Sequence, residues 1–284
     1  MYKRKYHYLV AGLADLIFDN NKSNLDMSEF REELKIALHP SDYSLVSILF
    51  LPADNKNFIA FSEGKEASWD PLGNYTLQDF EEQKWNIHSI QKEDRILPDY
   101  MVELMAVWVN SEKVISRLEM EKTLSEGYIS MALDSGNSFL EKWVSFDRDI
   151  NNIFTLINSR TLNLDPGSFI IGNDPFSREL KDISERGKDF MMPAEPDYAP
   201  GIFKIALENE FLEKEKRIDI ARWDFIDSVT FFEYFTIDLI LGYLIKLSIV
   251  LRWKKLDPET GKILLQKLIN EMEAPAISGN YNIK

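Results

Sequence analysis

The stretch FFEYFTIDLILGYLIKLSIVLRW, from Phe231 to Trp253, is the most apolar part of the chain. Four charged residues interrupt it: Glu233, Asp238, Lys246 and Arg252. A membrane-spanning helix needs about 20 predominantly apolar residues, and a charge near the bilayer centre costs about 2.5 to 3.5 kcal/mol. Asp238 and Lys246 are too close together to leave such a span between them. We therefore expect one helix that is mostly core or faces a partner, with Glu233, Asp238 and Lys246 at its edge.

The amino-acid composition limits how large the hydrophobic core can be and which class of partner the chain can bind. With 284 residues, of which 45% are hydrophobic, the chain can bury one large core or two modest ones. Its formal net charge of -14 argues against duplex nucleic acid, because that affinity comes from lysines and arginines that neutralise phosphates. The one short basic run is MYKRKYH at the N-terminus. No nucleic-acid partner is expected.

The absence of cysteine narrows the chemistry and is compatible with a reducing compartment. It excludes disulfides, thiolate metal sites and cysteine nucleophiles. The residues around Lys5 begin like a secretory signal, with a basic start and an apolar run. Asp15 breaks that run early, and no A-x-A cleavage site follows it. We expect a cytoplasmic protein.

Helix start signals recur along the chain. Asp26-x-x-Glu29 predicts a helix that covers Ser28 to Leu38 and ends before a proline. Ser138-x-x-Glu141 is a capping box, and Asp257 followed by proline is typical of a helix N-terminus. Apolar residues recur at helical spacing after both signals. They are Trp143, Phe146, Ile150, Ile153, Phe154 and Ile157 after the first, and Ile263, Leu264, Leu265, Leu268, Ile269 and Met272 after the second.

The remaining segments complete a helical fold. Helices are expected from Tyr100 to Leu133, with a break near Asn110, and from Phe203 to Arg222. The apolar run Tyr43 to Leu51 fits a buried strand or a helix, because periodicity cannot separate the two. The proline-rich loop 192–201 predicts a lobe boundary, since its prolines cannot continue a helix. We predict a mainly α fold, a single helical domain over residues 1–284 with two or three packed lobes and at most a small β element.

Motifs for phosphate, metal or nucleophile chemistry are missing from the sequence. Neither G-x-x-x-x-G-K-[ST] nor G-x-G-x-x-G occurs, and no serine stands in G-x-S-x-G. His7, His39 and His88 are far apart and belong to no metal-binding motif. No catalytic, cofactor-binding or metal-binding residue is therefore predicted, and no cofactor. A helical enzyme whose site joins dispersed carboxylates and histidines remains an alternative.

Four stretches carry a resemblance to a known family. These are Tyr6 to Asp19, Trp223 to Asp227, Phe231 to Phe235, and Tyr243 to Trp253. They resemble an uncharacterised bacterial family, common in Bacteroidetes and spirochaetes, whose members are encoded among the subunits of a V/A-type rotary ATPase. The resemblance extends from Tyr6 to about residue 272. The operons that encode these family members together with the ATPase subunits commonly lack a recognisable gene for the C subunit.

The resemblance implies the role of that C subunit, called d in eukaryotic enzymes. This subunit is an all-helical, multi-lobed funnel that seats the central stalk on the membrane rotor ring. The implied partners are the central-stalk subunits and the proteolipid ring of an ion-transporting ATPase, on the cytoplasmic side of the inner membrane. Such an adaptor is not an enzyme and needs no cofactor. A peripheral assembly or regulatory factor of the same ATPase is an alternative.

Short D-x-x-N motifs extend the resemblance to the repeated helical units of the C subunit. Asp54-x-x-Asn57 and Asp149-x-x-Asn152 match, and Arg160 follows the second motif. A third unit is expected around Asp238, where Leu241 stands in place of the asparagine. The residues that the resemblance marks as structural are Asp54, Asn57, Asp149, Asn152, Arg160, Trp223, Asp227, Tyr243, Lys246, Arg252 and Trp253.

Overall fold

The computed structural model describes residues 4–18, 25–88, 95–111, 114–161, 167–185, 193 and 195–255. Over these residues it contains eleven α-helices, one 3-10 helix and no strand, which confirms the prediction of a mainly α fold. The elements are α1 (His7–Ala11), α2 (Met27–Ala37), α3 (Pro40–Ser62), η1 (Glu66–Ser68), α4 (Leu77–Trp85), α5 (Asp99–Asn110), α6 (Arg117–Leu133), α7 (Ser138–Thr161), α8 (Pro175–Glu185), α9 (Ala199–Ala206), α10 (Phe211–Thr230) and α11 (Ile237–Lys255).

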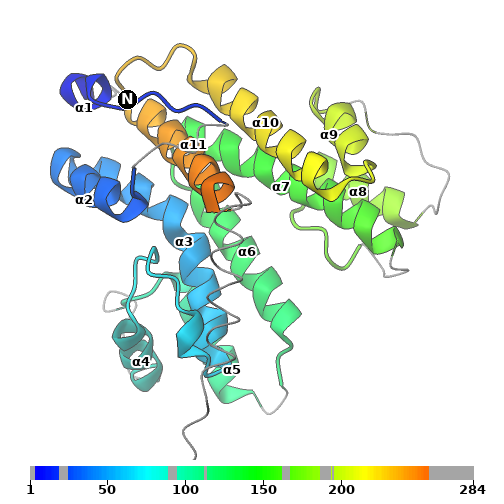
Figure 1. Ribbon diagram of the computed structural model, residues 1–284. Helices are drawn as coiled ribbons and strands as arrows, with labels where there is room; N and C mark the ends of the chain where they lie inside the picture. Colours follow the sequence, from blue (N-terminus) through cyan, green and yellow to red (C-terminus); the bar gives the residue numbers. More distant parts are fainter. Residues whose placement is uncertain are drawn as a thin grey trace, which may run out of the picture.

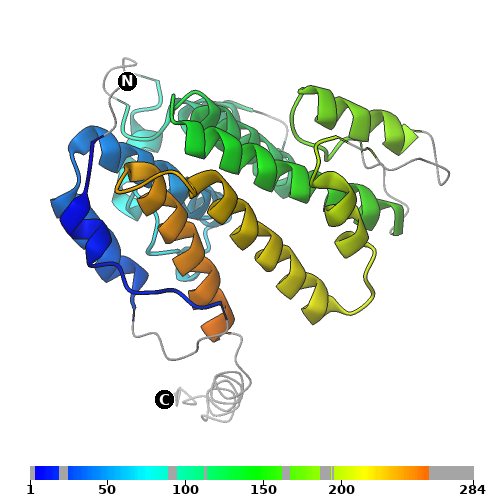
Figure 2. The same ribbon diagram turned by 90° about the horizontal axis from the view of Figure 1, so that it is seen from above.

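The helices form two arms that meet near α11 (Figure 1). One arm is built on α3 and α6, with α4 and α5 beside them. The other is built on α7 and α10, with α8 and α9 at its far end (Figure 2). Helix α11 packs against α3, α7 and α10, and so touches both arms. The buried apolar side chains form one cluster that runs through both arms.

Helix boundaries follow the predicted caps closely. The Asp26 carboxylate accepts hydrogen bonds from the backbone N–H groups of Ser28 and Glu29, at 2.8 and 3.1 Å, and thereby starts α2 as predicted. The cap of α7 lies one residue earlier than the predicted capping box. Asn137 Oδ1 accepts from the Leu140 N–H at 2.9 Å. The expected break near Asn110 is also present, because α5 ends there.

The ambiguous run Tyr43 to Leu51 lies inside α3, so the option of a strand there is wrong. Val46, Ile48 and Phe50 are all buried, together with residues on the other sides of the helix. A helix that is buried on every side shows no amphipathic period, which is why the pattern resembled a strand. Packing against other parts of the fold therefore accounts for the apolar pattern of this run, which local periodicity could not assign to a strand or a helix.

The stretch that begins at Phe231 is not one helix. Helix α10 ends at Thr230, a turn follows, and α11 begins only at Ile237. The predicted position of Asp238 at the helix edge is also wrong, because it is 2% exposed. Within the described part of the chain, no helix combines the length and hydropathy that crossing a bilayer requires.

Three further predictions were revised or lie wholly or partly outside the described residues. The helix expected from Phe203 to Arg222 is divided, because α9 ends at Ala206 and α10 begins at Phe211. The predicted loop at 192–201 is described only in part, and α9 begins inside it at Ala199. The helix predicted after Asp257 lies outside the described residues.

Candidate functional site

The first D-x-x-N pair lies in the buried part of α3. Asn57 is fully buried, and its amide contacts one residue of the loop that follows the helix. Its Nδ2 donates to the Asp70 carbonyl oxygen at 3.0 Å, and its Oδ1 accepts from the Asp70 backbone N–H at 2.7 Å. One side chain thus satisfies both backbone groups of a loop residue and fixes the loop to the helix.

Asp54 holds the next part of the same loop. Its Oδ1 accepts from the backbone N–H groups of Asn74 and Tyr75, at 2.7 and 3.1 Å. Its Oδ2 accepts from Asn74 Nδ2 at 2.6 Å. Burial raises the pKa of Asp54 from 3.8 to about 6, although these donors act in the opposite direction. The carboxylate of Asp54 therefore serves as a structural hydrogen-bond acceptor for this loop.

The loop approaches this pair so closely that position 73 requires glycine. A Cβ at Gly73 would stand 2.7 Å from both Asn57 Nδ2 and Asp54 Oδ1. On its other side, Arg31 of α2 donates to the carbonyl oxygens of Leu72 and Gly73, at 2.6 and 3.2 Å. The loop is clamped between α2 and α3.

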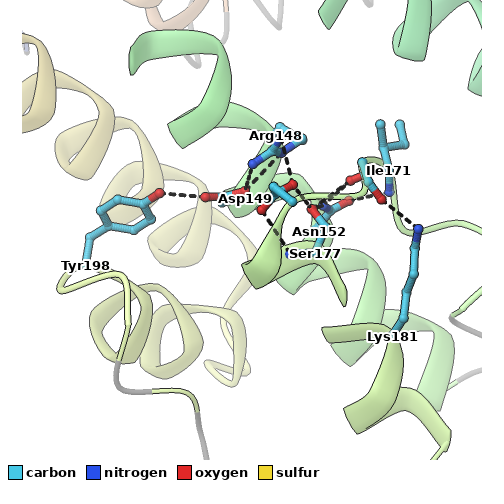
Figure 3. Close-up of polar contacts among 9 residues, drawn as sticks. Arg148, Asp149, Asn152, Ile171, Ser177, Lys181 and Tyr198 are labelled. Carbon is cyan, nitrogen blue, oxygen red and sulfur yellow. Dashed lines mark hydrogen bonds and ion pairs between the residues drawn. The ribbon is translucent and has the colours of Figure 1, made fainter. Parts of the chain in front are cut away.

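The second D-x-x-N pair, in α7, repeats the contact of the first (Figure 3). Asn152 is 2% exposed. Its Nδ2 donates to the Ile171 carbonyl oxygen at 2.8 Å, and its Oδ1 accepts from the Ile171 backbone N–H at 2.9 Å. Ser177 Oγ, from α8, donates to the same carbonyl oxygen at 3.0 Å. The asparagine again holds both backbone groups of one loop residue.

Asp149 has different partners from Asp54. Its Oδ2 accepts from the Tyr198 hydroxyl at 2.6 Å, and its Oδ1 accepts from Arg148 Nη2 at 2.8 Å. Arg148 also pairs with Asp174, at the start of α8, at 2.9 Å. Burial raises the pKa of Asp149, and burial together with the hydrogen bond to Asp149 raises the pKa of Tyr198. This network joins α7 to the beginnings of α8 and α9 (Figure 3).

The two D-x-x-N helices and the loops that follow them form two units with the same arrangement. Each has a long buried helix whose asparagine pins one loop residue, a glycine in that loop, and a short helix after it. The loop after α3 leads through η1 to α4, and the loop after α7 leads to α8. Gly172 has a φ of 102°, a conformation that L side chains rarely adopt, and its carbonyl accepts from Lys181 Nζ at 2.7 Å. The sequence echo therefore corresponds to a repeated local structure.

The region of the expected third unit differs. Asp238 is buried in α11 and accepts a hydrogen bond from Asn137 Nδ2 at 2.7 Å. Leu241 is fully buried and apolar, so it cannot pin a loop as Asn57 and Asn152 do.

Arg160 lies in the last turn of α7, and its side chain is outside the described part of the molecule.

The other residues marked by the resemblance meet along the seam between α10 and α11, under the N-terminal segment. Lys246 pairs with Asp227, and its Nζ lies 4.6 Å from the centroid of the Trp223 ring. The Tyr243 hydroxyl donates to the Ala14 carbonyl oxygen at 3.1 Å. The contacts of Lys246 join α11 to α10, and the hydrogen bond of Tyr243 fastens the N-terminal segment to α11.

The same seam contains a buried carboxylate that the sequence analysis missed. Asp219 of α10 is 1% exposed and accepts from Trp253 Nε1 at 2.7 Å and from Arg252. Arg222 donates to Asp219 at 3.2 Å and to Asp147 of α7 at 2.9 Å. This chain of ion pairs joins α7, α10 and α11.

One hollow of the described surface contains several charged side chains. A hollow of about 630 Å³ lies between α3 and α6. Two of its basic side chains pair with acidic neighbours, Arg117 with Glu121 at 2.8 Å and Lys65 with Glu63 at 2.9 Å. Among the described residues, no three His, Cys, Asp or Glu side chains gather in a metal-binding arrangement.

The comparisons with known proteins give one match. No curated protein and no solved structure shows significant similarity to the chain. Residues 3–276 match the family described as Protein of unknown function (DUF2764). Because this match covers nearly the whole chain, the protein belongs to the DUF2764 family.

Proposed function

We propose that this chain is a non-catalytic subunit of a bacterial V/A-type rotary ATPase, a C/d-like adaptor that couples the central stalk to the membrane rotor ring. The observation that carries the proposal is the pair of asparagine-pinned units. In each unit, a buried side chain holds the loop after a long helix, at Asp70 and at Ile171. Repeated helical units of this kind are what the resemblance to the C subunit implies.

An adaptor that transmits rotation needs helices that do not slide or bend relative to each other. The chain of ion pairs from Asp147 through Arg222 and Asp219 to Arg252 supports this requirement, because it joins α7, α10 and α11 around a buried carboxylate. Side chains in a close-packed interior transmit strain, and a fully bonded buried polar network adds a defined geometry to that packing. Such a molecule can pass a torque with little slack.

The placement of the buried carboxylates also supports a role without catalysis. Asp54, Asp149, Asp219 and Asp238 lie on four different helices, and each accepts hydrogen bonds from the protein itself. A general acid or base needs access to a substrate in a shared cleft. These carboxylates instead anchor loops and helices.

Purification of the tagged chain from its native membranes tests the proposal. We expect the other ATPase subunits to be recovered with it, at about one copy of this chain per rotary complex by quantitative mass spectrometry. Recovery of no ATPase subunit would overturn the proposal. A substoichiometric amount, with pumping intact after deletion of the gene, would instead identify a peripheral assembly or regulatory factor.

A matched pair of variants connects the test to the structure. Asn152→Leu removes a pinning amide, whereas Asn158→Leu changes an exposed asparagine on the same helix. If pinning maintains the coupling geometry, Asn152→Leu lowers ion pumping per ATP hydrolysed in native membrane vesicles, and Asn158→Leu leaves the ratio unchanged. If both variant proteins are present in the complex and pump equal numbers of ions per ATP hydrolysed, the pinned units have no role in coupling.

A further inference from the structure

One end of the molecule carries aromatic side chains that no described part of the chain covers. Phe231, Phe232 and Tyr234 are 66%, 80% and 61% exposed, and all three belong to the turn between α10 and α11 (Figure 1). The Phe231 and Phe232 rings meet edge to face, with centroids 4.8 Å apart. Contiguous exposed apolar side chains in a soluble fold mark a surface that binds something.

The backbone of this turn is fixed so that the three aromatics point outward. Phe235 has a φ of 63°, and its carbonyl oxygen accepts from the Tyr6 backbone N–H at 2.7 Å. The Phe235 ring faces the His7 ring, with centroids 4.5 Å apart. Phe235 is thus tied to the N-terminal segment, while its three aromatic neighbours remain outside. Their exposure is a property of an ordered turn.

Basic side chains stand directly beside the aromatic turn. Lys5 is exposed, and its Nζ donates to the Tyr234 carbonyl oxygen at 2.8 Å. Arg4 is 47% exposed and lies 3.3 Å from Asp42, which is 13% exposed. Both belong to the short basic run MYKRKYH, in a chain with a net charge of -14. Exposed aromatics and cations therefore share one end of an acidic molecule with two carboxylates, Asp42 beside Arg4 and Glu233 within the turn.

We propose that this end, formed by Phe231, Phe232 and Tyr234 with Arg4 and Lys5, binds the headgroup region of an anionic lipid bilayer. Aromatic side chains are favoured at the membrane interface, where their rings reach the acyl boundary. Lysine and arginine are drawn to anionic lipid headgroups within a Debye length of the surface. Stable peripheral binding generally needs both contributions, and this end supplies both.

The shape and the charge of the molecule favour a bilayer over a pocket in another protein. The aromatics project from a turn, and a fluid interface accepts a projecting group without a matching cavity. The acidic remainder of the chain is repelled by anionic lipid, so the basic end is the part that can approach it. This inference goes beyond the proposed function and holds for the isolated chain, whether or not the ATPase is present.

Vesicle binding by the full-length purified protein tests the inference. We expect co-sedimentation with vesicles of phosphatidylcholine and phosphatidylglycerol, weaker binding at high salt, and little binding to phosphatidylcholine alone. The double variant Phe231→Ser/Phe232→Ser should lower the partition coefficient about tenfold or more, because it removes the inserting rings. Lys5→Glu should lower binding to the anionic vesicles, because it reverses the charge beside the turn.

The opposite end of α10 offers a matched control. Phe211 and Leu212 are 75% and 58% exposed, so Phe211→Ser/Leu212→Ser makes a similar change to exposed apolar surface far from the basic run. This control should bind vesicles like the wild type. Equal losses in the two double variants, or wild-type binding that does not depend on anionic lipid, would overturn the inference.

The result of the vesicle experiment can be distinguished from the result of the co-purification experiment that tests the proposed function. If the wild type binds no vesicles, and Phe231→Ser/Phe232→Ser instead lowers the recovery of ATPase subunits, the aromatic end docks on a protein and the lipid inference is overturned. If the wild type binds anionic vesicles through this end but never co-purifies with ATPase subunits, the lipid inference stands without the adaptor proposal.

Discussion

At the scale of single residues, two buried asparagines perform the same task in different helices. Asn57 and Asn152 each match the N–H and the C=O of one loop residue, because the amide places an acceptor oxygen and a donor nitrogen side by side. The sequence marked both positions through their spacing from Asp54 and Asp149. It could not identify the loop residues that they hold, because these are 13 and 19 positions away and carry no motif of their own.

Asn152→Leu should destabilise the fold. The change leaves the Ile171 N–H without its partner, at about 1 to 3 kcal/mol, whereas the Ile171 carbonyl oxygen keeps its hydrogen bond from Ser177. Asn158→Leu, at an exposed position of the same helix, should stay within about 0.5 kcal/mol of the wild type. Urea unfolding of both variants measures the difference. Equal free energies of unfolding would show that the amide does not anchor the loop.

Two glycines should respond to alanine with opposite signs. Gly73→Ala places a Cβ 2.7 Å from two buried polar atoms and should destabilise the fold by at least about 1 kcal/mol. Gly201 lies in α9, and a Cβ there would have no other atom within 4 Å, so Gly201→Ala should raise stability by up to about 1 kcal/mol. Thermal unfolding of both variants gives the two signs. A stable Gly73→Ala variant would contradict the close approach of the loop.

The pKa of Asp54 makes a specific prediction for the pH dependence of stability. Burial raises this pKa from 3.8 to about 6, so the folded state binds the proton more tightly than the unfolded state. The contribution of this group to stability is fully present below about pH 3.8 and is lost as the pH rises to about 6, with a size of roughly 3 kcal/mol.

The Asp54→Asn variant isolates that contribution. Between pH 4 and pH 7, the wild type should lose more stability with rising pH than the variant, because only the wild type must ionise a buried carboxyl. Parallel curves of unfolding free energy against pH for the two proteins would contradict the raised pKa. The comparison removes the contributions of other carboxylates, which are common to both proteins.

At the scale of elements, local signals located most helices, and tertiary contacts decided the rest. The cap at Asp26 and the break near Asn110 were visible in the sequence because they depend on neighbouring residues. The end of α10 at Thr230 was not, because apolar composition does not distinguish a buried helix from an exposed aromatic turn. Asp219 was missed because its partners Arg252 and Trp253 lie on another helix.

The seam between α10 and α11 should depend on Asp219 far more than on Asp227. Asp219→Ala removes the shared acceptor of Arg222, Arg252 and Trp253, and the loss of a hydrogen bond to a charged group costs about 1.5 to 3 kcal/mol. Asp227 is 59% exposed in its pair with Lys246, so Asp227→Ala should cost at most about 1 kcal/mol. Denaturant unfolding ranks the two variants. The reverse ranking would show that the buried network does not hold the seam.

At the scale of the whole molecule, the two arms joined near α11 fit the role of a rigid connector. The mainly α fold was predictable from capping and periodicity alone, whereas the arrangement of the arms depends on contacts between distant helices. The adaptor role rests on the sequence resemblance and on the two pinned units. Membership of the DUF2764 family confirms the prediction of an uncharacterised family, and the link to an ATPase stays a prediction.

The most direct test of the adaptor role is the coupling of ATP hydrolysis to ion pumping in native membrane vesicles from which this chain is absent. Our account predicts that the ion gradient is lost while the catalytic subunits retain ATPase activity, and that the wild-type chain restores pumping. An undiminished gradient per ATP hydrolysed in the absence of the chain would contradict it.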